Sequence, residues 1–173
     1  MIDVLVWLFG IGAMMSLFIS YQQKTRTGLL VAKLSADVFW LSHYFCLGAS
    51  GGMIPNCVGV FREIVFLNRK KHRWAGIFLW PVLFIAVNWI LSFLSFDGWI
   101  DLLPIAASSA ATVVLWIDRP RLTKIVLVPV SLSFLIYDIF VGSYVGIVNE
   151  IIGISSIVIY FIKEARKKER SNG

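Results

Sequence analysis

Seven long apolar runs, separated by connections of only a few residues, constrain this chain more than any other feature of its sequence. A helix that crosses a membrane needs about 20 predominantly apolar residues, so seven crossings would use roughly 140 residues of the chain. The runs do not alternate in the way that the strands of a transmembrane barrel do. Hydrophobic residues make up 58% of the 173 residues and charged residues only 15%, which excludes disorder. We therefore expect an all-α integral membrane protein without a separate soluble domain.

The positions of the basic residues predict how the helices are oriented. We place the helices at residues 2–20, 29–48, 52–67, 75–95, 100–117, 124–141 and 143–162. The first, third and fifth connections and the C-terminal tail carry 14 of the 16 Lys and Arg residues. Because basic connections stay in the cytoplasm, this pattern predicts the N-terminus outside and the C-terminus inside. Topology thus accounts for the net charge of +6, and we expect the lipid bilayer, not nucleic acid, as a partner.

An internal repeat relates the first three helices to the last three at an offset of 94 residues. The offset superimposes glycines pairwise: Gly48 on Gly142, Gly52 on Gly146 and Gly59 on Gly153. A single helix between two triplets gives both triplets the same direction, which is a parallel repeat. We expect a first repeat at 1–67, a basic loop and linker helix at 68–98, a second repeat at 99–162, and a basic cytoplasmic tail at 163–173.

Four charged residues lie in the cytoplasmic halves of the second and third predicted helices. Lys33 and Asp37 are four residues apart and share a helix face. Arg62 and Glu63 lie on the next helix, which runs the other way, so all four reach similar depth. An Asp37–Arg62 pair would offset the cost of placing these charges in the membrane. The cluster could hold the helices together, or it could be an inner gate of ion pairs.

Polar residues in the outer half lack a basic partner. Asp138 lies about one turn from the outer end of its helix, and Glu150 lies about two turns into the last helix. Glu150 could bind a proton, a cation or a polar substrate, or it could bond to a neighbouring helix. Asn56 is opposite Glu150 in the repeat alignment, and Asn149 precedes Glu150. Asn side chains offer donors and acceptors either to a substrate or to another helix.

Aromatic residues accompany these polar groups. Trp40, His43 and Tyr44 share one face of the second helix, and Tyr137 lies next to Asp138 on the sixth. Flat rings with polar tips can form the walls of a binding site for a sugar or a ring, although the same spacing also suits simple packing.

No enzyme motif is present. The chain has no phosphate-binding loop, dinucleotide-binding motif or H-E-x-x-H motif. Its two His and two Cys residues are scattered, which argues against a metal site. We expect no enzyme activity, no cofactor and no metal, and the sequence leaves a homo-oligomer open.

Two stretches resemble a known bacterial family. These are SYQQKTRTGLL at 20–30 and FWLSHYFCLGASGG at 39–52, followed by the helix that contains Arg62. They are similar to the YgjV-type bacterial inner-membrane proteins. The resemblance is best over residues 10–70 and implies a multi-pass protein of the inner membrane.

The third helix also resembles that of SWEET and PQ-loop transporters. It reads NCVGVFREIVF at 56–66, and Asn56, Gly59, Glu63 and Phe66 match the N-x-x-G-x-x-x-E-x-x-aromatic pattern of plant SWEETs. The resemblance implies a 3+1+3 fold and a place for Asn56 in the sugar site. In the seventh helix that family has Asn three residues before a Gly, where this chain has Glu150.

Together these features predict a transporter of a small polar, sugar-like metabolite that works by alternating access between two three-helix bundles. The expected substrate site combines Asn56, Asn149 and Glu150 with the aromatic group and Asp138, and the four charged residues form the inner gate. The alternative is a membrane receptor, chaperone or assembly factor that transports nothing and acts through its basic loops and tail.

Overall fold

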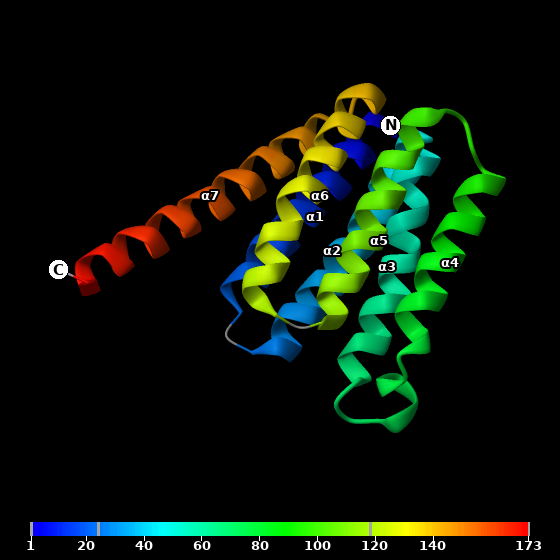
Figure 1. Cartoon of the computed structure of the whole chain (residues 1–173). Coiled ribbons are helices and arrows are strands. Elements are labelled where there is room, and N and C mark those ends of the chain that lie inside the picture. Colours follow the sequence, from blue (N-terminus) through cyan, green and yellow to red (C-terminus); the bar gives the residue numbers. More distant parts are fainter. Residues whose placement is uncertain (1, 24, 118, 173) are drawn as a thin grey trace.

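A computed structural model describes residues 2–23, 25–117 and 119–172, and over these ranges the chain forms seven α-helices (Figure 1). The helices are α1 (Ile2–Gln22), α2 (Arg26–Leu47), α3 (Ser50–Asn68), α4 (Leu79–Leu94), α5 (Leu102–Ile117), α6 (Pro120–Val141) and α7 (Tyr144–Asn172). Two short 3₁₀ helices, η1 (Arg73–Gly76) and η2 (Trp99–Asp101), precede α4 and α5. Each of the seven predicted apolar runs is thus a helix.

Four of the helices are long and apolar enough to cross a membrane. Their apolar spans are Asp3–Ser20, Trp99–Ile117, Arg121–Val141 and Tyr144–Glu164, and α4 is a shorter apolar helix. Helices α2 and α3 contain the charged residues noted above and are less apolar. Helix α3 packs against α2, α4 and α5, so its charged side chains lie inside the bundle and away from the surface that would face lipid.

Three helix boundaries differ from the prediction by four residues or more. Helix α6 begins at Pro120, not at 124. Helix α4 begins at Leu79, not at 75, because residues 73–76 form η1. Helix α7 continues to Asn172, ten residues beyond the predicted end at 162. The predicted tail contains no Gly or Pro before its last residue and is rich in Lys, Arg and Glu, which favour helix. The tail therefore extends α7.

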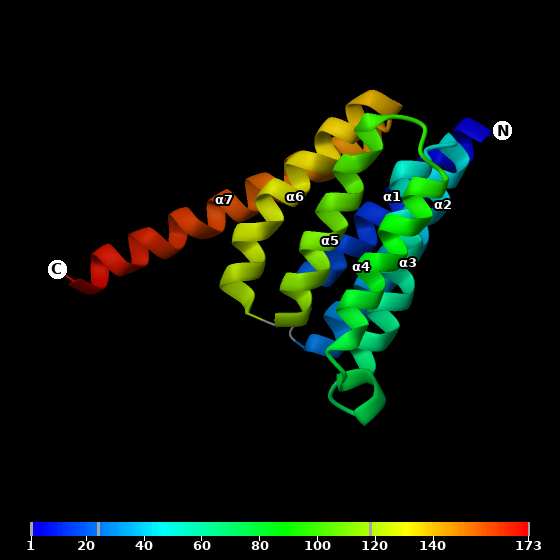
Figure 2. The same ribbon diagram turned by 45° about the vertical axis from the view of Figure 1, so that its right-hand side comes forward.

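The helices pack in a pattern that recurs in the two halves of the chain. Helix α2 packs between α1 and α3, and α6 packs between α5 and α7. The halves meet where α1 contacts α7 and where α3 contacts α5, while α4 covers α3 and α5 from outside. Both views show α7 leaving the bundle at an angle, so that the C-terminus lies far from the other helices (Figures 1 and 2).

The α2–α3 and α6–α7 turns lie at the end of the bundle that also holds the N-terminus (Figure 1). Both turns begin with a glycine in the left-handed region, Gly48 at φ 68° and Gly142 at φ 71°, where other residues are strained. The same hydrogen bond closes each helix, with an N···O distance of 2.9 Å, from Ala49 to Tyr44 and from Ser143 to Asp138. The turns are 94 residues apart and share one geometry.

Candidate functional site

Two clusters of buried polar side chains lie at different depths in the bundle. We call Lys33, Asp37, Arg62, Glu63 and Thr112 the ion-pair cluster. We call His43, Tyr44, Tyr137, Asp138 and Ser143 the turn cluster, because it lies beside the two matched turns. Buried polar groups need partners to offset the loss of water, and the partners differ between the clusters.

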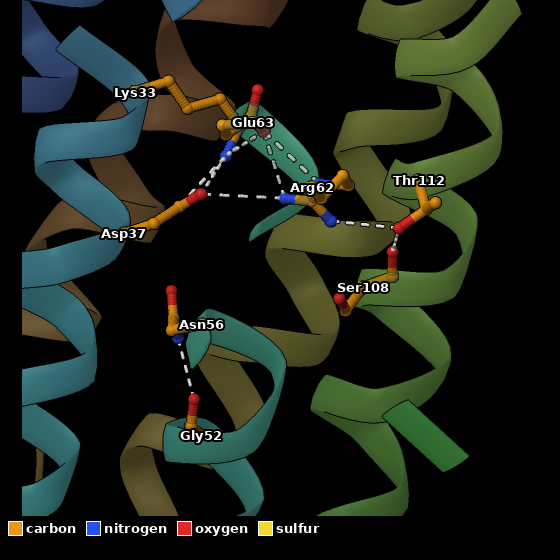
Figure 3. A network of polar contacts seen from close by, with 8 residues as sticks. All are labelled: Lys33, Asp37, Gly52, Asn56, Arg62, Glu63, Ser108 and Thr112. Carbon is orange, nitrogen blue, oxygen red and sulfur yellow. Dashed lines mark hydrogen bonds and ion pairs between the residues drawn. The ribbon is translucent and has the colours of Figure 1, made fainter. Parts of the chain in front are cut away.

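The ion-pair cluster brings together the four charged residues that the sequence singled out (Figure 3). Lys33 Nζ lies 3.1 Å from Asp37 Oδ1 and 3.5 Å from Glu63 Oε1. The side chain of Lys33 is 21% exposed, whereas that of Glu63 is fully buried. Lys33 thus connects α2 to α3 at the edge of the cluster.

Arg62 occupies the centre of the ion-pair cluster. Its Nη2 lies 3.3 Å from Glu63 Oε1 and 3.8 Å from Asp37 Oδ2. Its Nη1 donates a hydrogen bond of 3.0 Å to Thr112 Oγ1 on α5, and Thr112 donates in turn to the carbonyl of Ser108. Two cations therefore face two carboxylates, so the cluster carries no net formal charge. Sequence reasoning missed Thr112, the contact of this cluster with the second half of the chain.

The turn cluster joins the two halves through three hydrogen bonds. Tyr44 Oη donates to Asp138 Oδ1 over 2.8 Å, from α2 to α6. His43 Nε2 lies 2.8 Å from Ser143 Oγ. The backbone N–H of Gly52, in the first turn of α3, donates to Tyr137 Oη over 2.9 Å. The side chains of this cluster are at most 3% exposed, so the contact excludes water.

Two glycines allow the close approach within the turn cluster. A Cβ at Gly52 would lie 2.7 Å from the ring of Tyr44, and a Cβ at Gly146 would collide with the carboxylate of Asp138. These glycines are 94 residues apart, and so are the two side chains that they accommodate. The sequence repeat thus recurs in the packing around the turns.

His43 also borders a pocket at this end of the bundle. Its Nδ1 lies 2.9 Å from the carbonyl oxygen of Val6 on α1. The pocket is half open to the surroundings and is lined by residues of α1, α2 and the start of α7: Asp3, Val6, Trp7, His43, Leu47, Gly142, Tyr144 and Val145. The imidazole therefore lies between this pocket and Ser143.

The aromatic residues expected to form walls pack mainly against one another. The rings of Trp40 and Tyr44 stack with centroids 5.7 Å apart, and Trp40 meets His43 edge-on at 5.2 Å. Tyr44 and Tyr137 meet across the two halves with centroids 6.0 Å apart. In this structure the rings stabilise the contact between the halves.

Three polar residues expected in the substrate site lie on two helices, α3 and α7, that pack against different neighbours. Asn56, half-buried on α3, donates to the carbonyl of Gly52 over 2.8 Å. Asn149 on α7 donates to Glu150 Oε1 over 3.0 Å, and the Ser131 hydroxyl on α6 faces Glu150. Over the residues that the structure describes, no hydrogen bond joins Asn56 to Asn149 or Glu150. Figure 3 places Asn56 below the ion-pair cluster, with its amide oxygen pointing toward that cluster.

Helix α4 contributes a buried amide that the sequence reasoning passed over. Asn88 is 1% exposed and donates to the carbonyl of Ile105 on α5 over 3.3 Å. The sequence does contain a sign of this residue's role, because Asn88 is a single Asn within a strongly apolar helix. Among the described residues, no group of three or more His, Cys, Asp or Glu side chains is arranged to hold a metal ion.

Comparison with known proteins gives one match. A family model described as Imp-YgjV, bacterial inner membrane protein, matches residues 4–168. No curated protein and no solved structure matches the chain. The matched range covers nearly the whole chain, and the apolar helices fit a protein that crosses the membrane several times. The chain therefore belongs to the Imp-YgjV family of bacterial inner membrane proteins.

Proposed function

We propose that this protein carries a small polar solute across the inner membrane by rocking of two three-helix units, α1–α3 and α5–α7. The observation that carries the proposal is the turn cluster. Its hydrogen bonds cross between the units at one end of the bundle, and two of the three join side chains. Such contacts can break and re-form with little rearrangement inside either unit.

The packing supports a two-fold relation between the units. The contacts of α1 with α7 and of α5 with α3 are equivalent under the offset of 94 residues. Tyr44 and Asp138 are also equivalent positions, and they bond to each other. Equivalent positions meet only near a symmetry axis, so this bond lies where the axis of a parallel repeat would run.

The proposal assigns a gate to each cluster. The basic turn around η1 lies at the opposite end from the turn cluster (Figure 2). If basic connections are cytoplasmic, the turn cluster is the outer gate, closed in this structure. The ion-pair cluster is the inner gate, where Arg62 and Thr112 link the units. Asn56 lies between the two gates.

Asn56 is the residue that we propose for solute binding in the first unit, with Asn149 and Glu150 in the second. The bond to Gly52 uses one amide hydrogen of Asn56, so the side chain can still donate once and accept through its oxygen. These groups suit a solute with hydroxyl or amide groups. We propose neither an enzyme activity nor a cofactor.

Proteoliposomes that contain the full chain test the transport proposal. We expect uptake of at least one compound from a panel of radiolabelled sugars, polyols and amino acids, and a loss of about tenfold or more in Asn56→Ala, as for removal of one good bidentate contact. Asn68→Ala is a matched control, because Asn68 makes the same 2.8 Å bond to the carbonyl four residues back, but that bond is exposed whereas the Asn56 bond is partly buried. Equal uptake by the two variants would contradict the solute site, and uptake no better than that of protein-free vesicles would contradict transport.

The long α7 favours one alternative, a receptor or assembly factor that binds a partner through its basic end. Helix α7 extends well beyond its apolar span, which ends at Glu164, and leaves the bundle (Figure 1). Truncation after residue 162 distinguishes the two functions. Loss of a co-purifying partner with no uptake in either form would favour the alternative.

A further inference from the structure

We infer that Asp138 is a proton-binding site, reached from the pocket beside α1 through His43 and Ser143. Its role as the site that couples proton movement to solute transport rests on the proposed function, whereas proton binding itself does not. The inference rests on the surroundings of one carboxylate and on the groups that connect it to the pocket.

Asp138 is fully buried and lacks a basic partner. Its Oδ1 accepts the hydrogen bond from Tyr44, while its Oδ2 accepts no hydrogen bond of ordinary geometry among the described residues and lies beside the Ser143 hydroxyl. The cations of the ion-pair cluster are engaged with their own carboxylates. The groups that face Asp138 are Tyr44 from α2, Ser143 from the turn and Glu150 from α7. An ionised carboxylate is costly in such apolar surroundings unless it takes up a proton or a cation.

The space beside Oδ2 suits a proton better than a metal ion. A Cβ at Gly146 would collide with both Asp138 Oδ2 and Ser143 Oγ, so the two oxygens lie side by side against Gly146. Hard cations need several oxygen ligands, about six for Mg²⁺ and six to eight for Ca²⁺. Among the described residues, no group of three or more His, Cys, Asp or Glu side chains could hold such an ion here. A proton needs only one carboxylate oxygen.

A continuous set of polar groups leads from the pocket to the Asp138 carboxylate. His43 borders the pocket, and its Nε2 lies 2.8 Å from Ser143 Oγ. An imidazole can bind a proton at one nitrogen and release the other proton from the opposite nitrogen. A proton from pocket water would thus pass to His43, from His43 to the Ser143 hydroxyl, and from that hydroxyl to the Asp138 carboxylate. The net result is one proton bound to Asp138. His43 is left with its own proton on Nδ1, where it donates to the Val6 carbonyl, and its Nε2 accepts from the Ser143 hydroxyl. Both groups must therefore reset before a second proton can follow.

Infrared difference spectroscopy on the purified full chain in lipid nanodiscs tests proton binding. A pH step should change a carbonyl-stretching band of a protonated carboxyl group. We expect this band to disappear in Asp138→Asn and to persist in Asp97→Asn, a matched control at an exposed residue. Glu150→Gln should keep the Asp138 band and remove any band of Glu150. An unchanged spectrum in Asp138→Asn would overturn the inference, and so would a band that responds to Na⁺ or K⁺ but not to pH.

The rate at which the Asp138 carboxyl group exchanges its proton for deuterium in heavy water tests the path. The exchange is followed as a shift of the carbonyl-stretching band. We expect His43→Gln and Ser143→Ala to keep the band, which shows that the site is intact, but to slow its deuterium exchange at least tenfold. Exchange at the wild-type rate in both variants would overturn the path through these residues. Solute uptake is not measured here, so the outcome stands whether or not the transport proposal fails.

Discussion

The ion-pair cluster and the turn cluster place similar numbers of polar side chains in the same bundle, but they balance them differently. The ion-pair cluster pairs two cations with two carboxylates, mostly between the adjacent helices α2 and α3. The turn cluster contains one carboxylate, and only its Oδ1 accepts a hydrogen bond across the two units, from Tyr44, while its Oδ2 lacks a partner among the described residues. The first cluster therefore acts mainly within one unit and reaches the other through the Arg62–Thr112 bond, whereas the hydrogen bonds of the second lie between the units.

We therefore expect substitutions in the ion-pair cluster to change stability, and substitutions in the turn cluster to change how the two units are held together. Removing one charge from a balanced buried set leaves another charge without a partner, which is costly. Removing one hydrogen bond at the contact between the units costs less free energy. The loss weakens the contact between the two units and not the packing within either unit. Substitutions in the two clusters should thus differ in size and in the property that they change.

The largest effect should come from Arg62→Met, because Asp37 and Glu63 would lose one of the two cations that they share, which leaves two carboxylates for Lys33 alone. We expect a loss of about 3–5 kcal/mol in the free energy of unfolding, the cost typical of breaking a buried ion pair. Chemical unfolding in detergent, followed by tryptophan fluorescence, measures it. Arg73→Met at an exposed position of η1 is the control and should change stability little.

A double variant sharpens this prediction. Removal of Glu63 together with Arg62 leaves the Lys33–Asp37 pair, whose atoms are 3.1 Å apart, still balanced. The variant with both Arg62→Met and Glu63→Gln should therefore be more stable than Arg62→Met alone. A double variant that is less stable than the single one would show that charge balance does not hold this cluster together.

Tyr44→Phe should have a smaller effect, because it removes one hydrogen bond to Asp138. We expect a loss of about 1–3 kcal/mol, the cost of leaving a buried acceptor unsatisfied. In a double-mutant cycle with Asp138→Asn, the two substitutions should couple by at least about 0.5 kcal/mol, as residues in direct contact do. Tyr160→Phe on α7 is the control, since that residue is 40% exposed. Additive effects of Tyr44→Phe and Asp138→Asn would mean that the two halves are not joined by this bond.

Much of the fold could be predicted from local sequence patterns. The seven helices follow from apolar runs and intervening basic connections, because helix formation in a membrane depends mainly on length and hydropathy. The start of α4 was misplaced, since a 3₁₀ turn over residues 73–76 resembles helix in composition. The end of α7 was misplaced because the change from apolar to charged residues was taken as the end of the helix.

The two clusters differ in how far the sequence revealed them. Lys33, Asp37, Arg62 and Glu63 stand out as charges in apolar runs, and adjacent antiparallel helices bring them together. Thr112 and Ser143 were missed because single hydroxyls are common in membrane helices and turns. The bond between Tyr44 and Asp138 depends on how two distant units pack, and no local spacing specifies that.

The substitutions with the smallest expected effect, at Gly48 and Gly142, test whether the two turns are equivalent. Gly48 and Gly142 both have φ near 70°, and a Cβ at either position would meet nothing within 4 Å. Substitution by Ala should therefore cost only the backbone strain of the left-handed region, about 1–2 kcal/mol at each site. Gly98→Ala is a matched control, because its Cβ would also enter open space while its φ of −179° suits any residue. Chemical unfolding should give equal losses for Gly48→Ala and Gly142→Ala and none for Gly98→Ala. Unequal losses would show that the units share a sequence pattern without sharing the stability of their turns.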